Sequence, residues 1–205
     1  WGVRHDNGNA ILVKIPAPYD QIIPLYTAPF GRAIFDLDIS KNGDKLIASL
    51  SGVRGEQSLI LFDIPALEQG NTSYETVYSL DDNTLTQFRF SDDEQYLIGT
   101  SYYTGVSNVC RIKLEDKSFE LLSNTETGFF TPLQYNDSSL LVLRFNRDGM
   151  VPGIIPYRVL TEANSIGYLG NQVYERNPIV EEWSLPPASK RFEVSKQVSK
   201  AYHPL

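Results

Sequence analysis

The sequence has little of the chemistry that most catalytic and metal sites need. It contains one cysteine, Cys110, and two histidines, His5 and His203, which stand near the two ends of the chain. One cysteine excludes an intramolecular disulfide, and so few Cys and His residues argue against a zinc site. A Ser-His-Asp or Cys-His site needs a histidine held against a nucleophile and an acidic partner. We therefore predict no catalytic residue, no metal ligand and no cofactor, and we expect Cys110 to be a small core residue.

Basic residues and long apolar runs are also scarce. The 18 Lys and Arg residues are outnumbered by 25 Asp and Glu, and the net charge is −7. Because a nucleic-acid surface carries a basic stripe, we predict no nucleic-acid partner. No stretch approaches the roughly 18 apolar residues of a transmembrane helix, so we expect the chain itself not to span a membrane. Trp1 is not a translation start, and the lack of a secretory signal therefore carries no information.

The residues that are plentiful favour strands. Hydrophobic residues make up 41% and charged residues 21% of the chain, which is ordinary for a folded soluble protein. The 12 Tyr and 10 Phe suit half-buried pleated surfaces. The 14 Gly and 12 Pro supply turn formers at many points, which fits short strands better than long helices.

The strongest internal signal is a repeat. Residues 36–49 reappear as residues 87–100, and a weaker copy covers residues 133–142. Each copy alternates apolar and polar residues, passes through a turn rich in Ser, Asn, Asp and Gly, and enters a second apolar run, which predicts a β-hairpin. We expect the side chains at the start of each turn to hydrogen-bond backbone groups two residues further on. These residues are Ser40, Ser91 and Asn136.

The segments after the hairpins also match each other. Residues 58–64 and 107–114 are expected to form third strands, and residues 74–80 and 119–122 fourth strands, with turns between them. Four strands in a unit of about 45–50 residues are typical of propeller blades, which stack to cover their faces. The sequence therefore predicts an all-β fold, a β-propeller fragment of about four blades of four antiparallel strands.

The ends of the chain are less regular. Residues 10–15 and 22–26 are expected to be strands of an earlier blade. Towards the other end, a strand is expected at 166–169 and a helical turn at 171–176. We predict that residues 1–184 form the blades of a partial ring and that residues 185–205 are a linker or tail towards a following domain. Closed propellers usually have about four to eight blades, so another copy of the chain is one way to complete the ring.

The hairpin sequences resemble the S-P-D-G-x-x-L repeats of TolB-like, or WD40-like, bacterial propellers. The matching stretches are Asp38-Ile39-Ser40-x-Asn42-Gly43-x-Lys45-Leu46 and Phe90-Ser91-Asp92-Asp93-x-x-Tyr96-Leu97. A narrower likeness, to uncharacterised bacterial envelope proteins in which such a propeller precedes an outer-membrane-type barrel, rests on residues 1–8, 15–19, 101–108 and 124–130.

This resemblance, and not composition or spacing, implies a cellular location and partners. It implies a periplasmic segment associated with the outer membrane, with residues 181–183 resembling the exit from the propeller. The implied partners are another protein of the cell envelope or the chain's own C-terminal barrel. The resemblance brings no established activity to particular residues.

Aromatic residues in loops are the best candidates for binding. The loop after the second strand of one repeat unit holds Tyr102 and Tyr103, and adjacent tyrosines offer large contact area with few rotatable bonds. The alternative is that one ring packs into the neighbouring blade. The same two interpretations apply to Phe129 and Phe130. The complete set of candidate binding residues is Arg54, Tyr102, Tyr103, Thr104, Asn108, Phe129 and Phe130.

Two functions from different classes remain open. The first is a non-catalytic protein-binding or scaffold module, and under this hypothesis the chain is not an enzyme. The alternative is a carbohydrate-binding or glycan-cleaving propeller, for which Asp36, Asp38 and Glu126 are the carboxylates nearest the starts of strands. The residues from Asp36 onward also begin like a calcium loop, but Lys41 and Ile47 stand where such a loop needs Gly and Glu, so we expect a hairpin there.

Overall fold

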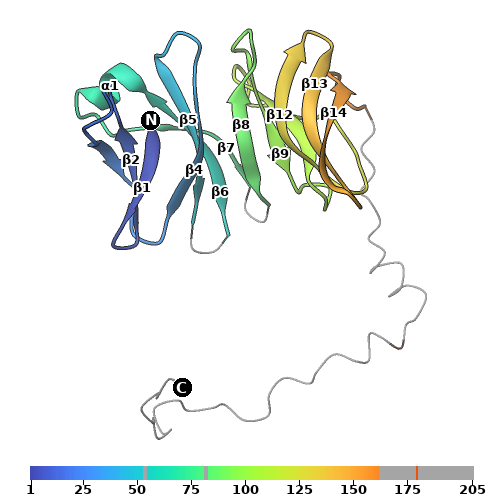
Figure 1. The fold of residues 1–205 in the computed structure, drawn as a ribbon, viewed down its shortest axis with the longest axis horizontal. Helices are drawn as coiled ribbons and strands as arrows, with labels where there is room; N and C mark the ends of the chain where they lie inside the picture. The colour runs from blue at the N-terminus through green and yellow to red at the C-terminus, as the bar shows by residue number, and fades with distance from the viewer. Residues whose placement is uncertain (53–54, 81–82, 162–178, 180–205) are drawn as a thin grey trace, which may run out of the picture. The chain divides into compact units, whose positions relative to one another are not determined.

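The structure is a computed structural model that describes residues 1–52, 55–80, 83–161 and 179. The elements described below belong to one compact unit, Trp1–Ile166. They are four antiparallel sheets in which strands that follow each other in sequence lie next to each other (Figure 1).

The four sheets follow the chain in order. The first contains β1 (Gly2–Asp6), β2 (Asn9–Lys14) and β3 (Ile23–Thr27). The second contains β4 (Ala33–Ile39), β5 (Lys45–Ser51), β6 (Gln57–Asp63) and β7 (Glu75–Leu80). The third contains β8 (Leu85–Phe90), β9 (Tyr96–Ser101), β10 (Asn108–Lys113) and β11 (Phe119–Leu121). The fourth contains β12 (Phe129–Asn136), β13 (Ser139–Asn146) and β14 (Gly149–Pro156).

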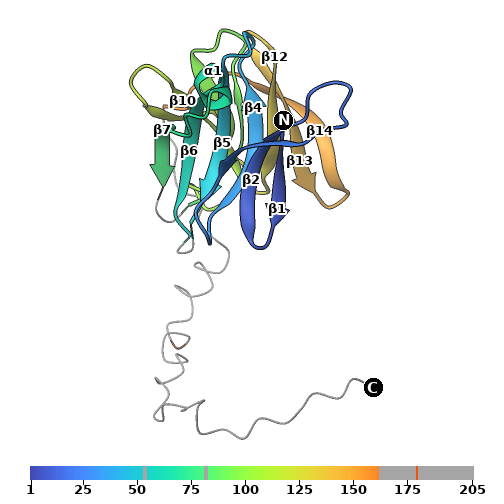
Figure 2. The same ribbon diagram turned by 90° about the vertical axis from the view of Figure 1, so that its left-hand side faces the viewer.

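This architecture confirms the predicted all-β propeller fragment with four blades, and it refines the strand count. The two middle sheets have four strands, whereas the first and fourth have three within the described residues. The turn between β1 and β2 lies on the same edge as the turn between β5 and β6 (Figures 1 and 2), so β1 is equivalent to β5. The described part of the first sheet therefore lacks a counterpart of β4.

The apolar cores lie between neighbouring sheets, as expected for blades that cannot bury both faces alone. Between the first and second sheets, Leu12 and Ala28 pack with Ile34, Leu46 and Phe62. The next two interfaces repeat the arrangement with different residues. Ile47, Leu59, Val77, Leu85, Phe88, Leu97, Cys110 and Ile112 are buried between the second and third sheets, and Ile98, Val109, Leu122, Leu140 and Val142 between the third and fourth.

The hairpin turns are held by the predicted residues, but two of them bond differently from the prediction. Asn136 accepts a hydrogen bond from the backbone N–H of Ser138, two residues on, as predicted (2.9 Å). The hydroxyl of Ser40 instead accepts from the N–H of Lys45, five residues on (2.9 Å). Ser91 bonds in the same way across its own turn. Both serines are buried inside the hairpin, where the returning strand supplies the nearest donor.

One helix was not predicted. Helix α1 (Ile64–Glu68) lies in the segment that we expected to be a turn. Asp63 caps it by accepting a hydrogen bond from the N–H of Ala66 (2.7 Å), and Pro65 occupies its first turn, where a missing N–H costs nothing. Five residues are too few for an amphipathic period to be visible in the sequence.

Several predictions about the C-terminal region lie outside the described residues. These are the strand at 166–169, the helical turn at 171–176 and the tail at 185–205. The boundary predicted at residue 184 therefore stays a prediction.

Candidate functional site

The loop between β9 and β10, residues 102–107, presents the two candidate tyrosines to solvent. We call it the tyrosine loop. Tyr102 is 42% exposed and Tyr103 is 58% exposed. The loop is a tight turn, closed by a hydrogen bond from the N–H of Gly105 to the carbonyl of Tyr102 (2.6 Å). Gly105 has a φ of 90°, which favours glycine, so the turn conformation is built into the sequence.

One of the two rings is supported from behind by other aromatic side chains. The rings of Tyr103 and Phe119 lie 5.5 Å apart at 53°, and Phe119 stacks on Tyr78 with centroids 5.5 Å apart. Burial raises the pKa of the Tyr78 hydroxyl above its ordinary value. The three rings therefore form a row from Tyr78 on β7 through Phe119 on β11 to Tyr103 in the loop. This packing restricts the Tyr103 ring but leaves it exposed to solvent.

The structure places Thr104 and Asn108 inside the protein, where they support the loop. Both are buried, and the Asn108 amide donates to the Thr104 hydroxyl (2.8 Å). The Asn108 carbonyl oxygen accepts from the hydroxyl of Ser123 and from the N–H of Thr125, both at 2.8 Å. A buried amide that satisfies several partners rigidifies its surroundings. Thr104 and Asn108 therefore hold the loop that carries Tyr102 and Tyr103.

The two phenylalanines contribute mainly to packing. Phe129 is half-buried against the core between the third and fourth sheets, and its backbone exchanges hydrogen bonds with Ser107 at the end of the tyrosine loop. Phe130 is half-buried and lies over Gly128, where an added Cβ would come within 2.9 Å of its ring. In both cases the packing alternative describes the observed environment. Arg54 lies outside the described residues.

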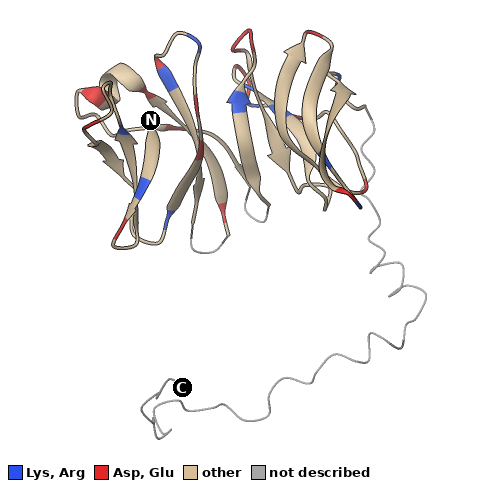
Figure 3. Cartoon of the chain, in the orientation of Figure 1, with Lys and Arg blue, Asp and Glu red and all other residues tan. Residues whose placement is uncertain are grey.

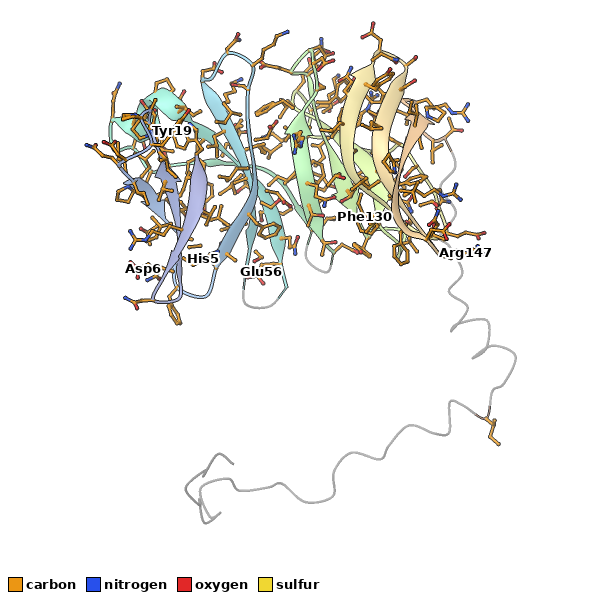
Figure 4. All side chains as sticks on the ribbon, in the orientation of Figure 1. His5, Asp6, Tyr19, Glu56, Phe130 and Arg147 are labelled. Carbon is orange, nitrogen blue, oxygen red and sulfur yellow. The ribbon has the colours of Figure 1, made fainter. Side chains whose placement is uncertain are left out.

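The tyrosine loop lies on the edge of the sheets that Figure 4 shows at the bottom. This edge carries His5, Glu56, Phe130 and Arg147, and Tyr19 lies at the opposite edge (Figure 4). The exchange of hydrogen bonds between Ser107 and the start of β12 joins the tyrosine loop to the strand that bears Phe130. We call this edge the tyrosine edge.

A second feature, on the first strands of the sheets, was missed from the sequence. Asp36, Gln87 and Thr131 have φ values of 53°, 60° and 46°, and each lies at a register shift in β4, β8 or β12. The Asp36 carboxylate accepts from the N–H of Gln87, and the Gln87 amide oxygen accepts from the N–H of Thr131, both at 2.7 Å. Each of these register shifts is a β-bulge, and a side-chain hydrogen bond links the bulge of one sheet to the bulge of the next. Left-handed φ values at residues other than Gly leave no clear sequence signal.

The carboxylates considered for glycan chemistry have structural partners. Asp36 accepts the bond just described, and Asp38 accepts from the N–H of Phe90 (2.9 Å). Asp38 also lines a cavity of about 290 Å³ together with Arg89 and Gln134, whereas Glu126 is exposed in the connection before β12. This placement does not select an acid–base pair among them. Among the described residues, no group of three or more His, Cys, Asp or Glu side chains is placed to hold a metal ion.

Two further predictions concern single residues. Cys110 is fully buried between the second and third sheets, and burial raises the pKa of its thiol, which confirms it as a core residue. His5 is exposed on β1, and His203 lies outside the described residues. The residues from Asp36 onward form β4 and a hairpin turn, as predicted in place of a calcium loop.

Charged residues of both signs are spread over the described sheets (Figure 3). Figure 3 shows Lys and Arg at separate places among Asp and Glu on the sheets. The described part of the chain contains no helix that is both long and apolar enough to cross a bilayer.

Comparison with solved structures shows which fold these sheets form. A putative TolB from Agrobacterium tumefaciens matches with a TM-score of 0.56 at 11% identity, over 76% of this chain and 58% of the other. TolB from Acinetobacter baumannii matches with a TM-score of 0.52 at 13% identity, over 78% of this chain and 41% of the other. The chain has a TolB-like propeller fold. It spans 58% and 41% of these two structures. No family model and no curated protein matches the sequence.

A third match corrects the prediction that the chain is not an enzyme. An oligogalacturonate lyase in complex with manganese matches with a TM-score of 0.52 at 10% identity, over 69% of this chain and 39% of the other. Since this enzyme is built on the same kind of blades, the prediction was wrong to exclude catalysis from a propeller of this type. The scarcity of Cys and His argues only against the particular chemistries that need those residues.

Proposed function

We propose that this chain is a protein-binding propeller module and that the tyrosine edge makes the contact. The observation that carries the proposal is the exposure of Tyr102 and Tyr103 on a loop whose conformation is held by the buried side chains of Thr104 and Asn108. A rigid loop loses little conformational entropy when it binds, and tyrosine rings supply contact area at low entropic cost. Aromatic anchors of this kind commonly dominate the energy of protein interfaces.

The resemblance of the hairpin repeats to TolB-like propellers supports a cellular setting for this function. We propose that the chain belongs to the cell envelope, on the periplasmic side and beside the outer membrane. In that setting the partner is another envelope protein or a barrel in the same polypeptide. Fractionation of the source cells tests the location, because recovery with soluble cytoplasmic proteins would contradict it.

Capture from an envelope extract tests the binding function. The immobilised chain is compared with the double variant Tyr102→Ala/Tyr103→Ala and with a control, Tyr19→Ala. The control removes an exposed aromatic side chain from the opposite edge of the sheets, where Tyr19 is 76% exposed (Figure 4). All three chains are first checked for the same melting temperature, because none of the three rings is buried.

The proposal predicts that specific proteins are retained by the unchanged chain and by the control and are lost from the double variant. Loss of an anchoring pair typically weakens an interface by about 2 kcal/mol or more, which is roughly thirtyfold in affinity. Equal retention by the double variant and the unchanged chain would contradict the role of the tyrosine edge.

A further inference from the structure

Equivalent positions on two neighbouring first strands carry side chains of opposite charge. The sequence repeat places Asp38 on β4 and Arg89 on β8 at the same position. Asp38 pairs with Ile47, which is buried against the third sheet, and Arg89 pairs with Ile98, which is buried against the fourth. Directly paired residues in an antiparallel sheet share a face, so Asp38 and Arg89 each face the next sheet in the series.

The two side chains meet the next sheet differently. The Asp38 carboxylate accepts a hydrogen bond from the backbone N–H of Phe90 in the third sheet (2.9 Å). A guanidinium has no acceptor atom, so Arg89 cannot make the equivalent bond to the fourth sheet. The link between these sheets runs instead from the N–H of Asp92 to the amide oxygen of Gln134 (3.0 Å). Arg89 is exposed and has no hydrogen-bond or ion-pair partner among the described residues.

A cavity of about 290 Å³ lies where this equivalent bond is missing. Its walls come from the first strands β4, β8 and β12, from β9 and from the turn between β8 and β9. The third and fourth sheets pack directly on each other at this place, so the cavity does not belong to an outer face of the series. The polar side chains that line it are Asp38, Arg89, Asp92 and Gln134, beside Ile98 and Pro132.

The strands around Arg89 are held in fixed positions. Arg89 also lines a smaller cavity, of about 130 Å³, together with Asp36, Gln87 and Thr131. These three are the bulge residues that side-chain hydrogen bonds link from sheet to sheet. A preformed site of this kind loses little conformational entropy when it binds a ligand.

The charges in the larger cavity select the class of ligand. Arg89 disfavours a cation, and Asp38 and Asp92 disfavour a simple anion, because like charges placed together are costly. A neutral ligand avoids both costs if it offers donors to the carboxylates and acceptors to the guanidinium and to the NH₂ group of Gln134. A hydroxyl group is both donor and acceptor, and a sugar ring carries several of them without net charge. The cavity volume is at the lower end for ligand pockets, which fits one sugar residue better than a large molecule.

We propose that this cavity binds a sugar residue, either as a free sugar or as part of a glycan. The guanidinium of Arg89 and the NH₂ group of Gln134 donate to its hydroxyl oxygens, and the Asp38 carboxylate accepts from its hydroxyl groups. The inference concerns binding only, and no bond is made or broken. It does not rest on the proposed protein-binding function, since the tyrosine loop follows β9 and the turn that lines the cavity precedes β9.

An NMR titration of the isotope-labelled 205-residue chain tests the site. The probes are glucose, galactose and N-acetylglucosamine, each up to about 100 mM, a range that detects millimolar dissociation constants. Maltotriose and triacetylchitotriose are added to distinguish a glycan from a free sugar, and acetate and glycine serve as charged comparison ligands. Tighter binding of a trisaccharide than of its monosaccharide indicates a glycan, and equal binding indicates a free sugar.

Three variants locate the binding. Arg89→Ala removes the unpartnered guanidinium, and Gln134→Glu keeps the oxygen that accepts from Asp92 but replaces the NH₂ donor by a carboxylate oxygen. The matched control is Arg144→Ala, because Arg144 is exposed on β13, where it pairs with Phe129 at the other end of β12. Unchanged amide resonances in the rest of the spectrum confirm that each variant is folded.

The proposal predicts saturable shifts of the Phe90 and Asp92 amide resonances with at least one of the sugars. The dissociation constant should be at least about tenfold higher in Arg89→Ala, higher in Gln134→Glu and unchanged in Arg144→Ala. The absence of saturable shifts with all five sugars would overturn it, as would sugar binding that Arg89→Ala leaves unchanged. Shifts of the same resonances with acetate or glycine but not with sugars would show a site for charged ligands and would also overturn it.

Discussion

Replacing Asn108 by alanine should loosen the tyrosine loop at its base. Asn108 is fully buried and joins Thr104, Ser123 and Thr125 through three hydrogen bonds of 2.8 Å. Asn108→Ala removes all three and leaves a backbone N–H and two hydroxyls without this partner. At a net value of about 1 kcal/mol for each hydrogen bond, the free energy of unfolding should fall by about 2–4 kcal/mol.

Urea unfolding followed by far-ultraviolet circular dichroism measures this loss. With a urea dependence of about 2 kcal/mol per molar, the midpoint should fall by roughly 1–2 M. The matched control is Asn42→Ala, because Asn42 is exposed in the turn between β4 and β5, where a change should cost less than about 0.5 kcal/mol. A midpoint for Asn108→Ala as high as that of the control would refute the argument that this amide holds the loop.

Three further predictions concern the interior and one turn. Gly99→Ala should lower stability by about 1–3 kcal/mol, because a Cβ at Gly99 would lie 2.4 Å from the Phe88 ring; adding Phe88→Leu should recover part of the loss in urea unfolding, and strictly additive losses would contradict the clash. Cys110 should resist thiol reagents at pH 8 until the chain is unfolded, because burial raises its pKa; rapid labelling of the folded chain would contradict this. The Ser91 hydroxyl lowers the pKa of Asp93 below 3.8, so the ionised Asp93 stabilises the fold above that pH, and this stabilisation is lost as the pH falls through the folded-state pKa. Asp93→Asn should therefore flatten the fall of the free energy of unfolding with pH in this range, and an unchanged dependence on pH would contradict the argument.

The hairpins were the predictable part of the fold. Residues 36–49 and 87–100 share an alternation and a turn composition that depend only on local residue types, so both hairpins could be located from the sequence. The third and fourth strands followed from the spacing of the repeats. Cys110 could be assigned to the core because it stands on the apolar side of an alternating strand.

The features that were missed depend on contacts between sheets. The bulges at Asp36, Gln87 and Thr131 are defined by backbone conformation and by bonds to a neighbouring blade, which the local sequence does not encode. Helix α1 depends on a single cap.

The candidate binding residues stay a prediction, and the structure shows only where they lie. Tyr102 and Tyr103 are exposed on their loop. Thr104 and Asn108 were grouped with them because they belong to the same segment between the second and third strands of the repeat unit. The structure buries both, because Ser123 and Thr125 from the following connection supply the hydrogen bonds that water would otherwise make.

Photo-crosslinking in the source cells tests the binding function most directly. Tyr103 is replaced by the photoreactive residue p-benzoylphenylalanine, and the control places the same residue at Tyr19, which is 76% exposed at the opposite edge of the sheets (Figure 4). Our account predicts a discrete crosslinked species with an envelope protein from position 103 and none from position 19. Crosslinking from position 19 alone, or no species from position 103 in cells that contain the folded chain, would contradict it.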